Sequence, residues 1–176
     1  MKNNQDTSDD KKSYITYYDQ MPIPAVEENT EIYLAGSIAI GVQFRVLTDE
    51  RIAGLELEAA SGGERGKVIN LDDKGVALHV FTVDGSERTE CLRFDCFDDD
   101  PHYHFVNWGE MRNEMIHLDP VAHGDGLTWA LKTIKERLPQ MIDRALGQGA
   151  GAKVDLSAVE KILPLVTEAA FRARFQ

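Results

Sequence analysis

Histidine and acidic side chains gather in one segment of this chain, and they are the residue types best suited to chemistry. Four of the five histidines lie between positions 102 and 123, and two of them, His102 and His104, follow a run of three aspartates. Imidazole nitrogens and carboxylate oxygens bind divalent transition metals, and both groups can also move a proton. No other segment of the sequence gathers so many groups of this kind. This segment is therefore the candidate site.

The partners of these histidines depend on how two predicted strands pair. The sequence predicts strands over 88–97 and 102–107, joined by a turn over 98–101. Paired residues project from the same face of a sheet, so a turn of even length places Asp95 opposite His104. An odd turn would bury histidines among phenylalanines, and register follows the burial pattern, so the even turn is favoured. It predicts a polar face of Arg93, Asp95, His102 and His104, and an apolar face of Leu92, Phe94, Cys96, Tyr103 and Phe105.

The predicted polar face brings together the elements of a metal site. His102, His104 and Asp95 form a set of two imidazoles and one carboxylate, which suits a divalent transition metal with open coordination positions. His117 or Glu110 could add a further ligand. Without a metal, Asp95 could orient His104 as a general base. The alternative, which we favour on the sequence alone, is an exposed cross-strand Asp–His pair that contributes well under about 1 kcal/mol.

The elements that position these residues are mostly strands followed by two helices. Apolar residues alternate from Ile32 to Val46, which predicts a long strand with a bend near Gly36. Shorter strands are predicted over 55–59, 67–71, 76–83 and 115–118, with a turn over 72–75. The hairpin at 84–86 places His79 on the apolar face with Ala77, Phe81 and Val83, as a hydrogen-bonded core histidine.

The C-terminal third of the chain has helical periodicity. One helix is predicted to begin at Asp125, which can act as its N-cap, and another begins at Asp155 or Ser157. Pro139 and Pro164 should kink or restart these helices. Strands first and helices last predict an α+β fold. We expect an antiparallel, strongly twisted or bent sheet of about six strands, with two C-terminal helices packed on one of its faces.

The chain is expected to form one domain over 14–176, β-rich over 30–118 and helical over 125–176, after a disordered tail over 1–13. The tyrosines and prolines that follow the tail predict an arm that docks on its own domain, in preference to a second subunit. The small residues Ala35, Ser37, Ala39 and Gly41 predict close packing rather than the floor of a pocket.

The composition excludes several classes of partner and function. The net charge of −11 argues against nucleic acids and anionic membranes, because both require a positive surface. The sequence begins without a signal peptide and has no membrane-spanning apolar run, so we expect a cytoplasmic protein. Cys91 and Cys96 would lie about 16 Å apart on one strand, too far for a disulfide. Phosphate-loop and nucleophile-elbow motifs are absent.

Two hypotheses for the function follow from these observations. The favoured one is a non-catalytic binding module or a homo-oligomeric interaction module, because the sequence lacks a nucleophile motif and has an acidic surface and an aromatic arm. The alternative is a metal-binding protein or a metal-dependent enzyme that uses His102, His104 and Asp95, with a divalent transition metal as its cofactor. The sequence identifies neither a small-molecule ligand nor a protein partner.

Overall fold

A computed structural model describes residues 15–18, 21–48 and 72–175 of the chain. The strands predicted over 55–59 and 67–71, and the tail predicted over 1–13, lie outside these described residues. The remaining elements can be compared with the structure directly.

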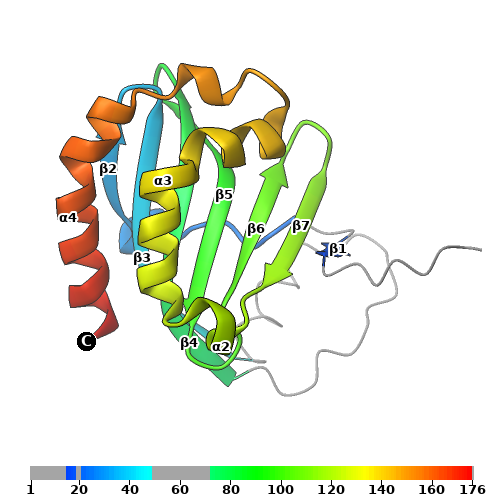
Figure 1. Cartoon of the computed structure of the whole chain (residues 1–176), viewed down its shortest axis with the longest axis vertical. Coiled ribbons are helices and arrows are strands. Elements are labelled where there is room, and N and C mark those ends of the chain that lie inside the picture. Colours follow the sequence, from blue (N-terminus) through cyan, green and yellow to red (C-terminus); the bar gives the residue numbers. More distant parts are fainter. Residues whose placement is uncertain (1–14, 19–20, 49–71, 176) are drawn as a thin grey trace, which may run out of the picture.

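The fold is α+β, as predicted, with a seven-stranded antiparallel sheet where about six strands were expected (Figure 1). The strand order across the sheet is β1-β7-β6-β5-β4-β3-β2, so neighbours in the sequence from β2 to β7 are also neighbours in space. The strands are β1 (Ile15–Tyr18), β2 (Glu31–Ala35), β3 (Ile38–Thr48), β4 (Asp72–Asp84), β5 (Glu87–Phe97), β6 (His102–Asn107) and β7 (Arg112–His117). The helices are the short η1 (Glu27–Asn29), α2 (Pro120–His123) and η2 (Gly151–Lys153), and the long α3 (Gly126–Leu146) and α4 (Leu156–Arg174).

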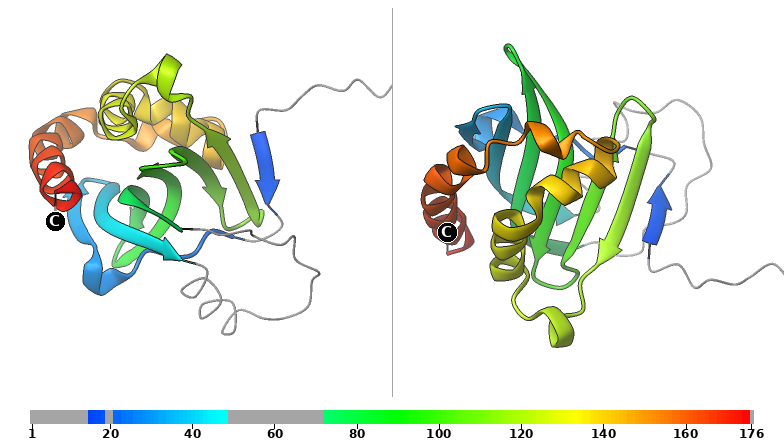
Figure 2. Two further views of the ribbon diagram at one scale, coloured as in Figure 1. Left: turned by 90° about the horizontal axis from the view of Figure 1, so that it is seen from below. Right: turned by 45° about the horizontal axis from the view of Figure 1, so that its top comes forward.

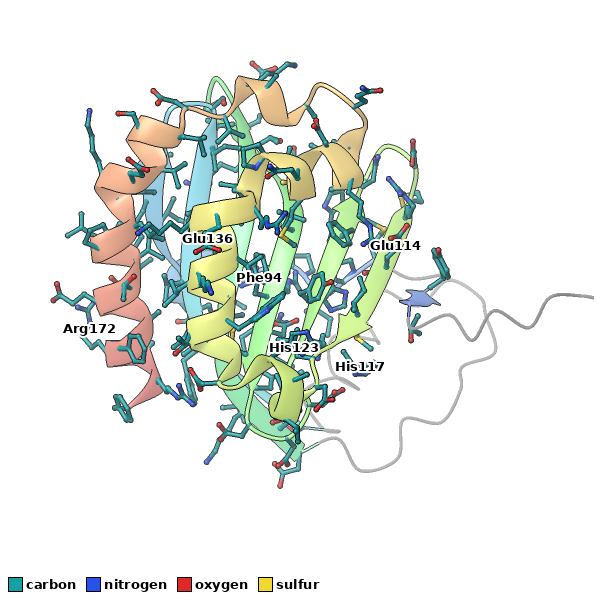
Figure 3. All side chains as sticks on the ribbon, in the orientation of Figure 1. Phe94, Glu114, His117, His123, Glu136 and Arg172 are labelled. Atoms are coloured by element: carbon teal, nitrogen blue, oxygen red, sulfur yellow. The ribbon has the colours of Figure 1, made fainter. Side chains whose placement is uncertain are left out.

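The two long helices cover one face of the curved sheet (Figure 2). Helix α3 lies on β5 and β6, and α4 lies on β3 and β2. Their apolar sides form the core with the alternating apolar residues of the strands, including Phe94, which Figure 3 shows beside α3. Asp125 and Asp155 cap α3 and α4, and each accepts a hydrogen bond from a backbone amide. Both helices continue through their prolines instead of restarting.

Two predictions for the N-terminal half of the sheet were wrong in detail. The residues from Ile32 to Val46 form a hairpin of β2 and β3 instead of one bent strand, and Gly36 turns the chain with a positive φ of 63°. Residues 72–75 were predicted as a turn but begin β4, because Asp72 and its successors pair with the end of β3. The long ladder between these strands outweighs the local turn preference of Asp, Lys and Gly.

The face predicted for His79 was wrong, although His79 is buried and hydrogen-bonded as predicted. The pairing of β4 with β5 shifts between Val80 and Phe81, so that Phe81 pairs with Glu90 but Val80 pairs with Leu92. This β-bulge changes which residues of β4 lie opposite a given residue of β5. Val76, Leu78 and Val80 therefore enter the core under the helices. His79 projects from the opposite face, where its cross-strand partner is Arg93.

The N-terminal arm docks on its own domain, as the favoured prediction had it. Strand β1 pairs antiparallel with β7 at one edge of the sheet, whereas β2 forms the other edge. The chain must therefore cross the sheet between β1 and β2, and it does so on the face that the helices leave free (Figure 1). We call residues 21–30 of this crossing segment the strap.

Candidate metal centre on the helix-free face

The helix-free face of the sheet carries a group of buried polar side chains. Alternate residues of β3 to β7 project to this side, because successive side chains of a strand point to opposite faces. Asp95 pairs with His102, and Arg93 pairs with His104. The buried polar residues on this face are Gln43, Arg45, His79, Glu90, Arg93, Asp95, His104 and Asn113. Charges at such depth require partners, so the arrangement of these groups is informative.

Asp95, His102 and His104 lie together on this face. One potential ligand atom from each residue falls within 4.8 Å of the other two. The distances from Asp95 Oδ2 to His102 Nε2 and to His104 Nε2 are both 3.5 Å. The predicted polar face is therefore correct, but the register differs from the prediction by two residues. Asp95 was predicted to lie opposite His104. It lies opposite His102 instead, and His104 lies opposite Arg93.

These residues do not form the exposed pair that the sequence favoured. Asp95 is only 3% exposed and His104 is 7% exposed. A carboxylate this far from water loses hydration, which costs free energy unless cations or donors replace the water. The burial of Asp95 and His104 therefore costs free energy that other interactions at the site must offset.

Both imidazoles are oriented by a hydrogen bond through their other nitrogen. His102 Nδ1 lies 2.6 Å from the backbone oxygen of Asp100, and His104 Nδ1 lies 2.8 Å from Asn113 Oδ1. Both oxygens are acceptors, so each Nδ1 carries the proton and donates it. Nε2, the atom that faces Asp95, carries a lone pair when the imidazole is neutral and a second N–H when it is protonated. Metal-binding histidines have this arrangement, in which an acceptor on one nitrogen fixes the tautomer and aims the other.

The charges around Asp95 keep it ionised. Burial alone would raise the pKa of Asp95, but the imidazoles of His102 and His104 outweigh this effect and hold the pKa well below its usual value. The guanidinium groups of Arg93 and Arg45 act in the same direction. For His102, burial lowers the pKa, but the effect of the nearby Asp95 carboxylate is larger and opposite. The net result is a raised pKa.

A second set of charges lies beside the first on the same face. Glu90 Oε1 is 2.6 Å from His79 Nδ1 and 2.9 Å from Arg93 Nε, and Glu90 Oε2 is 2.6 Å from Arg93 Nη2. Although burial opposes it, the positive charge of Arg93 lowers the pKa of Glu90 to about 2. Burial lowers the pKa of His79, so this imidazole is neutral and donates from Nδ1 to Glu90.

Among the described residues, the buried atoms of this face without a hydrogen-bond partner are acceptors. Gln43 Oε1, His79 Nε2 and Asp95 Oδ1 are buried without a hydrogen-bond partner. The guanidinium of Arg45 lies 3.6 Å from Asp95 Oδ1. Buried acceptors without donors cost free energy, and a cation or a donor-bearing ligand would remove that cost. The face therefore favours positive charge or hydrogen-bond donors.

The two additional predicted ligands differ in position. His117 lies next to His102, with ring centroids 6.1 Å apart, but its Nδ1 is bonded to Asp100 Oδ1 at 2.7 Å (Figure 3). Glu110 pairs with Arg112 near the β6–β7 turn and is not part of the group that could hold an ion. The aspartates at 98–100 form a turn, as predicted, and Asp73 accepts hydrogen bonds from two of its backbone amides.

Several residues of this face were not predicted from the sequence. Arg45 of β3 and Asn113 of β7 contact Asp95 and His104, and Glu90 contacts Arg93 from the same strand, β5. Only the alternation of polar residues along each strand could have indicated them, and the β-bulge interrupts that signal for Glu90. Cys91 and Cys96 are free cysteines, as predicted, and burial raises the pKa of the Cys91 thiol to about 12.

The comparison with protein families places most of the chain in a single family. The family model described as Domain of unknown function (DUF7700) matches residues 32–170. The chain belongs to this family. The match begins within β2 and ends within α4, and it includes the Asp95, His102 and His104 group. No curated protein and no solved structure matches the chain. Among the described residues, no helix is both long and apolar enough to cross a membrane.

Proposed function

We propose that this protein binds a divalent transition metal ion through Asp95, His102 and His104. The observation that carries the proposal is the orientation of the two imidazoles, since both donate from Nδ1 to an oxygen and present Nε2 to the same carboxylate. When both imidazoles are neutral, their Nε2 lone pairs and the ionised carboxylate repel one another unless a cation lies between them. A metal ion at this point would join β5 to β6.

The distances support a small ion with nitrogen and oxygen ligands. Ligand atoms about 2.1 Å from one ion at tetrahedral angles lie roughly 3.4 Å apart. The distances from Asp95 to the two histidines, both 3.5 Å, match this value. Imidazole ligands suit zinc, iron, copper or nickel better than magnesium or calcium, which prefer oxygen. Three protein ligands leave at least one position for water or a substrate, as catalytic sites require.

The competing account is a buried ion pair in which a protonated His102 faces Asp95. Metal binding distinguishes the two accounts. We expect tag-free protein, stripped with a chelator, to bind one zinc ion per chain in a calorimetric titration. The variant His102→Ala/His104→Ala should lose this binding, because a single carboxylate next to Arg45 and Arg93 holds a divalent cation weakly.

His123→Ala is the matched control for this titration. His123 lies on α2 and is exposed, outside the proposed ligand set (Figure 3), so its loss should leave the stoichiometry unchanged. The zinc affinity of His117→Ala in the same titration shows whether His117 supplies a fourth ligand. Wild-type protein without stoichiometric zinc binding, or a His102→Ala/His104→Ala variant that binds as the wild type does, would contradict the proposal.

The other hypothesis, a non-catalytic or homo-oligomeric interaction module, remains a prediction from the sequence. Its aromatic arm pairs with β7 of the same chain through β1. The metal site has a stated geometry, whereas this hypothesis has no comparable feature among the described residues, so the metal proposal is preferred. Sedimentation velocity over a range of protein concentrations tests self-association separately.

A further inference from the structure

A cavity of about 500 Å³ lies on the helix-free face, between the strap and the sheet. Pro24 and Ala25 of the strap form one wall, and Phe81, Thr89 and Glu90 of β4 and β5 lie opposite. Trp108, from the turn between β6 and β7, also lines it. Sites for small organic ligands span about 300–1,000 Å³, so the cavity has the size of a ligand site.

The cavity is separate from the proposed metal centre. Its sheet wall includes the row formed by Phe81 and Glu90, whereas Asp95 and His102 form a row farther along the same strands. The row of His79, Arg93 and His104 lies between the two. A ligand in the cavity therefore need not contact the ion, and its binding does not depend on metal binding.

The walls of the cavity are mostly apolar. Pro24, Ala25, Ile32, Phe81 and Trp108 supply aliphatic and aromatic surface, and aromatic rings contribute large contact areas with little loss of conformational freedom. The charged pair Arg88 and Glu27 joins β5 to the strap, and the two side chains neutralise each other. A ligand with a large apolar body would bury its surface against these walls.

Glu90 gives the cavity one specific polar feature. A carboxylate has about four acceptor positions, and the contacts of Glu90 with His79 and Arg93 occupy three of them. No described residue takes the remaining position on Oε2, and Glu90 lines the cavity. The open acceptor favours a ligand with an N–H or O–H donor. It disfavours an anion, because the charge of Arg93 is already matched by Glu90.

We infer that this cavity binds a neutral, largely apolar small molecule that donates one hydrogen bond to Glu90. The strap forms its outer wall, and Trp108 and Phe81 contact the apolar body of the ligand. Recognition then combines burial of apolar surface with one charge-assisted hydrogen bond.

The dye N-phenyl-1-naphthylamine has the required chemistry, since it is neutral and aromatic, carries one N–H donor and fluoresces more strongly in apolar surroundings. We expect saturable binding of one dye per chain to the full-length protein, measured by fluorescence and calorimetry. The sulfonated dye 8-anilino-1-naphthalenesulfonate has the same rings and an added negative charge, and it should bind at least about tenfold more weakly. The N-methylated neutral dye lacks the donor and should lose about tenfold in affinity.

Two variants fill the cavity from two of its walls. Ala25→Trp acts from the strap and Ile32→Trp from β2, where Ile32 lies beside Phe81 over Gly41, and each should weaken binding of the neutral dye at least about tenfold by occupying its space. Ile32 belongs to the sheet, so its variant tests the site even if Ala25→Trp disturbs the strap. Val26→Trp is the matched control, because Val26 is 45% exposed and does not line the cavity.

The inference is overturned by any of three results. The first is no saturable binding of the neutral dye to the wild type. The second is equal binding to folded Ala25→Trp or Ile32→Trp protein, with circular dichroism confirming the fold. The third is equal affinity for the neutral and the sulfonated dye. Equal affinity for the N-methylated dye would overturn the role of Glu90 as the acceptor.

Discussion

On the helix-free face, the carboxylate of Glu90 stabilises the buried positive charge of Arg93. Its carboxylate is 5% exposed and is bonded to both His79 and Arg93. We expect Glu90→Gln to lower the free energy of unfolding at pH 7 by about 3–5 kcal/mol, because Arg93 would become a buried cation without its main partner. Urea unfolding measures this change. The control is Glu136→Gln, which removes an exposed acid from α3 (Figure 3).

The same substitution has a pH dependence whose sign follows from the pKa of Glu90. This pKa is about 2 in the folded protein against an ordinary value of 4.5, so the stabilisation is fully present above pH 4.5. It is lost as the pH falls through the folded value of about 2. The difference in unfolding free energy between wild type and Glu90→Gln should therefore narrow between these pH values. A difference that stays constant down to pH 2 would be inconsistent with this account.

The shared face of Asp95, His102 and His104 could be predicted from the sequence because side-chain direction depends only on parity. Any even loop between β5 and β6 preserves that parity, so an error of two residues in the register left the face correct. The residues directly opposite one another could not be predicted, because they depend on the loop length. Arg45 was missed because its contact with Asp95 joins strands far apart in the sequence, and Asn113 was missed because it lies before the strand predicted over 115–118.

At the scale of elements, the helices were predicted more closely than the strands. Capping aspartates and apolar periodicity are local signals, and both describe α3 and α4 well. Strand ends depend on the partner strand, which explains why the beginning of β4 was predicted as a turn. The bulge between Val80 and Phe81 reversed the face of His79, since one extra residue in a strand changes the parity beyond it.

The contact of η2 with α3 depends on a glycine. A Cβ placed on Gly151 would lie 2.0 Å from the backbone oxygen of Pro139. We expect Gly151→Ala to lower the free energy of unfolding by about 2–3 kcal/mol, because the two backbones would have to separate. Thermal or urea unfolding measures the loss. Gly109→Ala is the matched control, since a Cβ there meets its nearest neighbour at 3.4 Å, and an equal effect of both substitutions would argue against this explanation.

At the scale of the whole molecule, the order of strands and helices was sufficient to predict the α+β class. It was not sufficient to predict that β1 would pair with β7 at the edge opposite β2. That pairing sends the strap across the helix-free face, and the strap forms one wall of the cavity. Neither the depth of the polar residues nor the cavity was predicted from the sequence. The cavity depends on contacts between the strap and strands much later in the chain.

Metal binding at the proposed centre should also stabilise the whole molecule. An ion bound to Asp95 of β5 and to both histidines of β6 requires the paired strands, so it binds the folded state in preference to the unfolded one. At a zinc concentration 100 times the dissociation constant, the unfolding free energy should rise by about 2.7 kcal/mol. For a chain of this size, that gain raises the melting temperature by roughly 5–10 °C. Zinc binding by histidines in the unfolded chain would reduce this shift, so His102→Ala/His104→Ala provides the baseline. A zinc-dependent rise of equal size in that variant would show that the stabilising ion binds elsewhere.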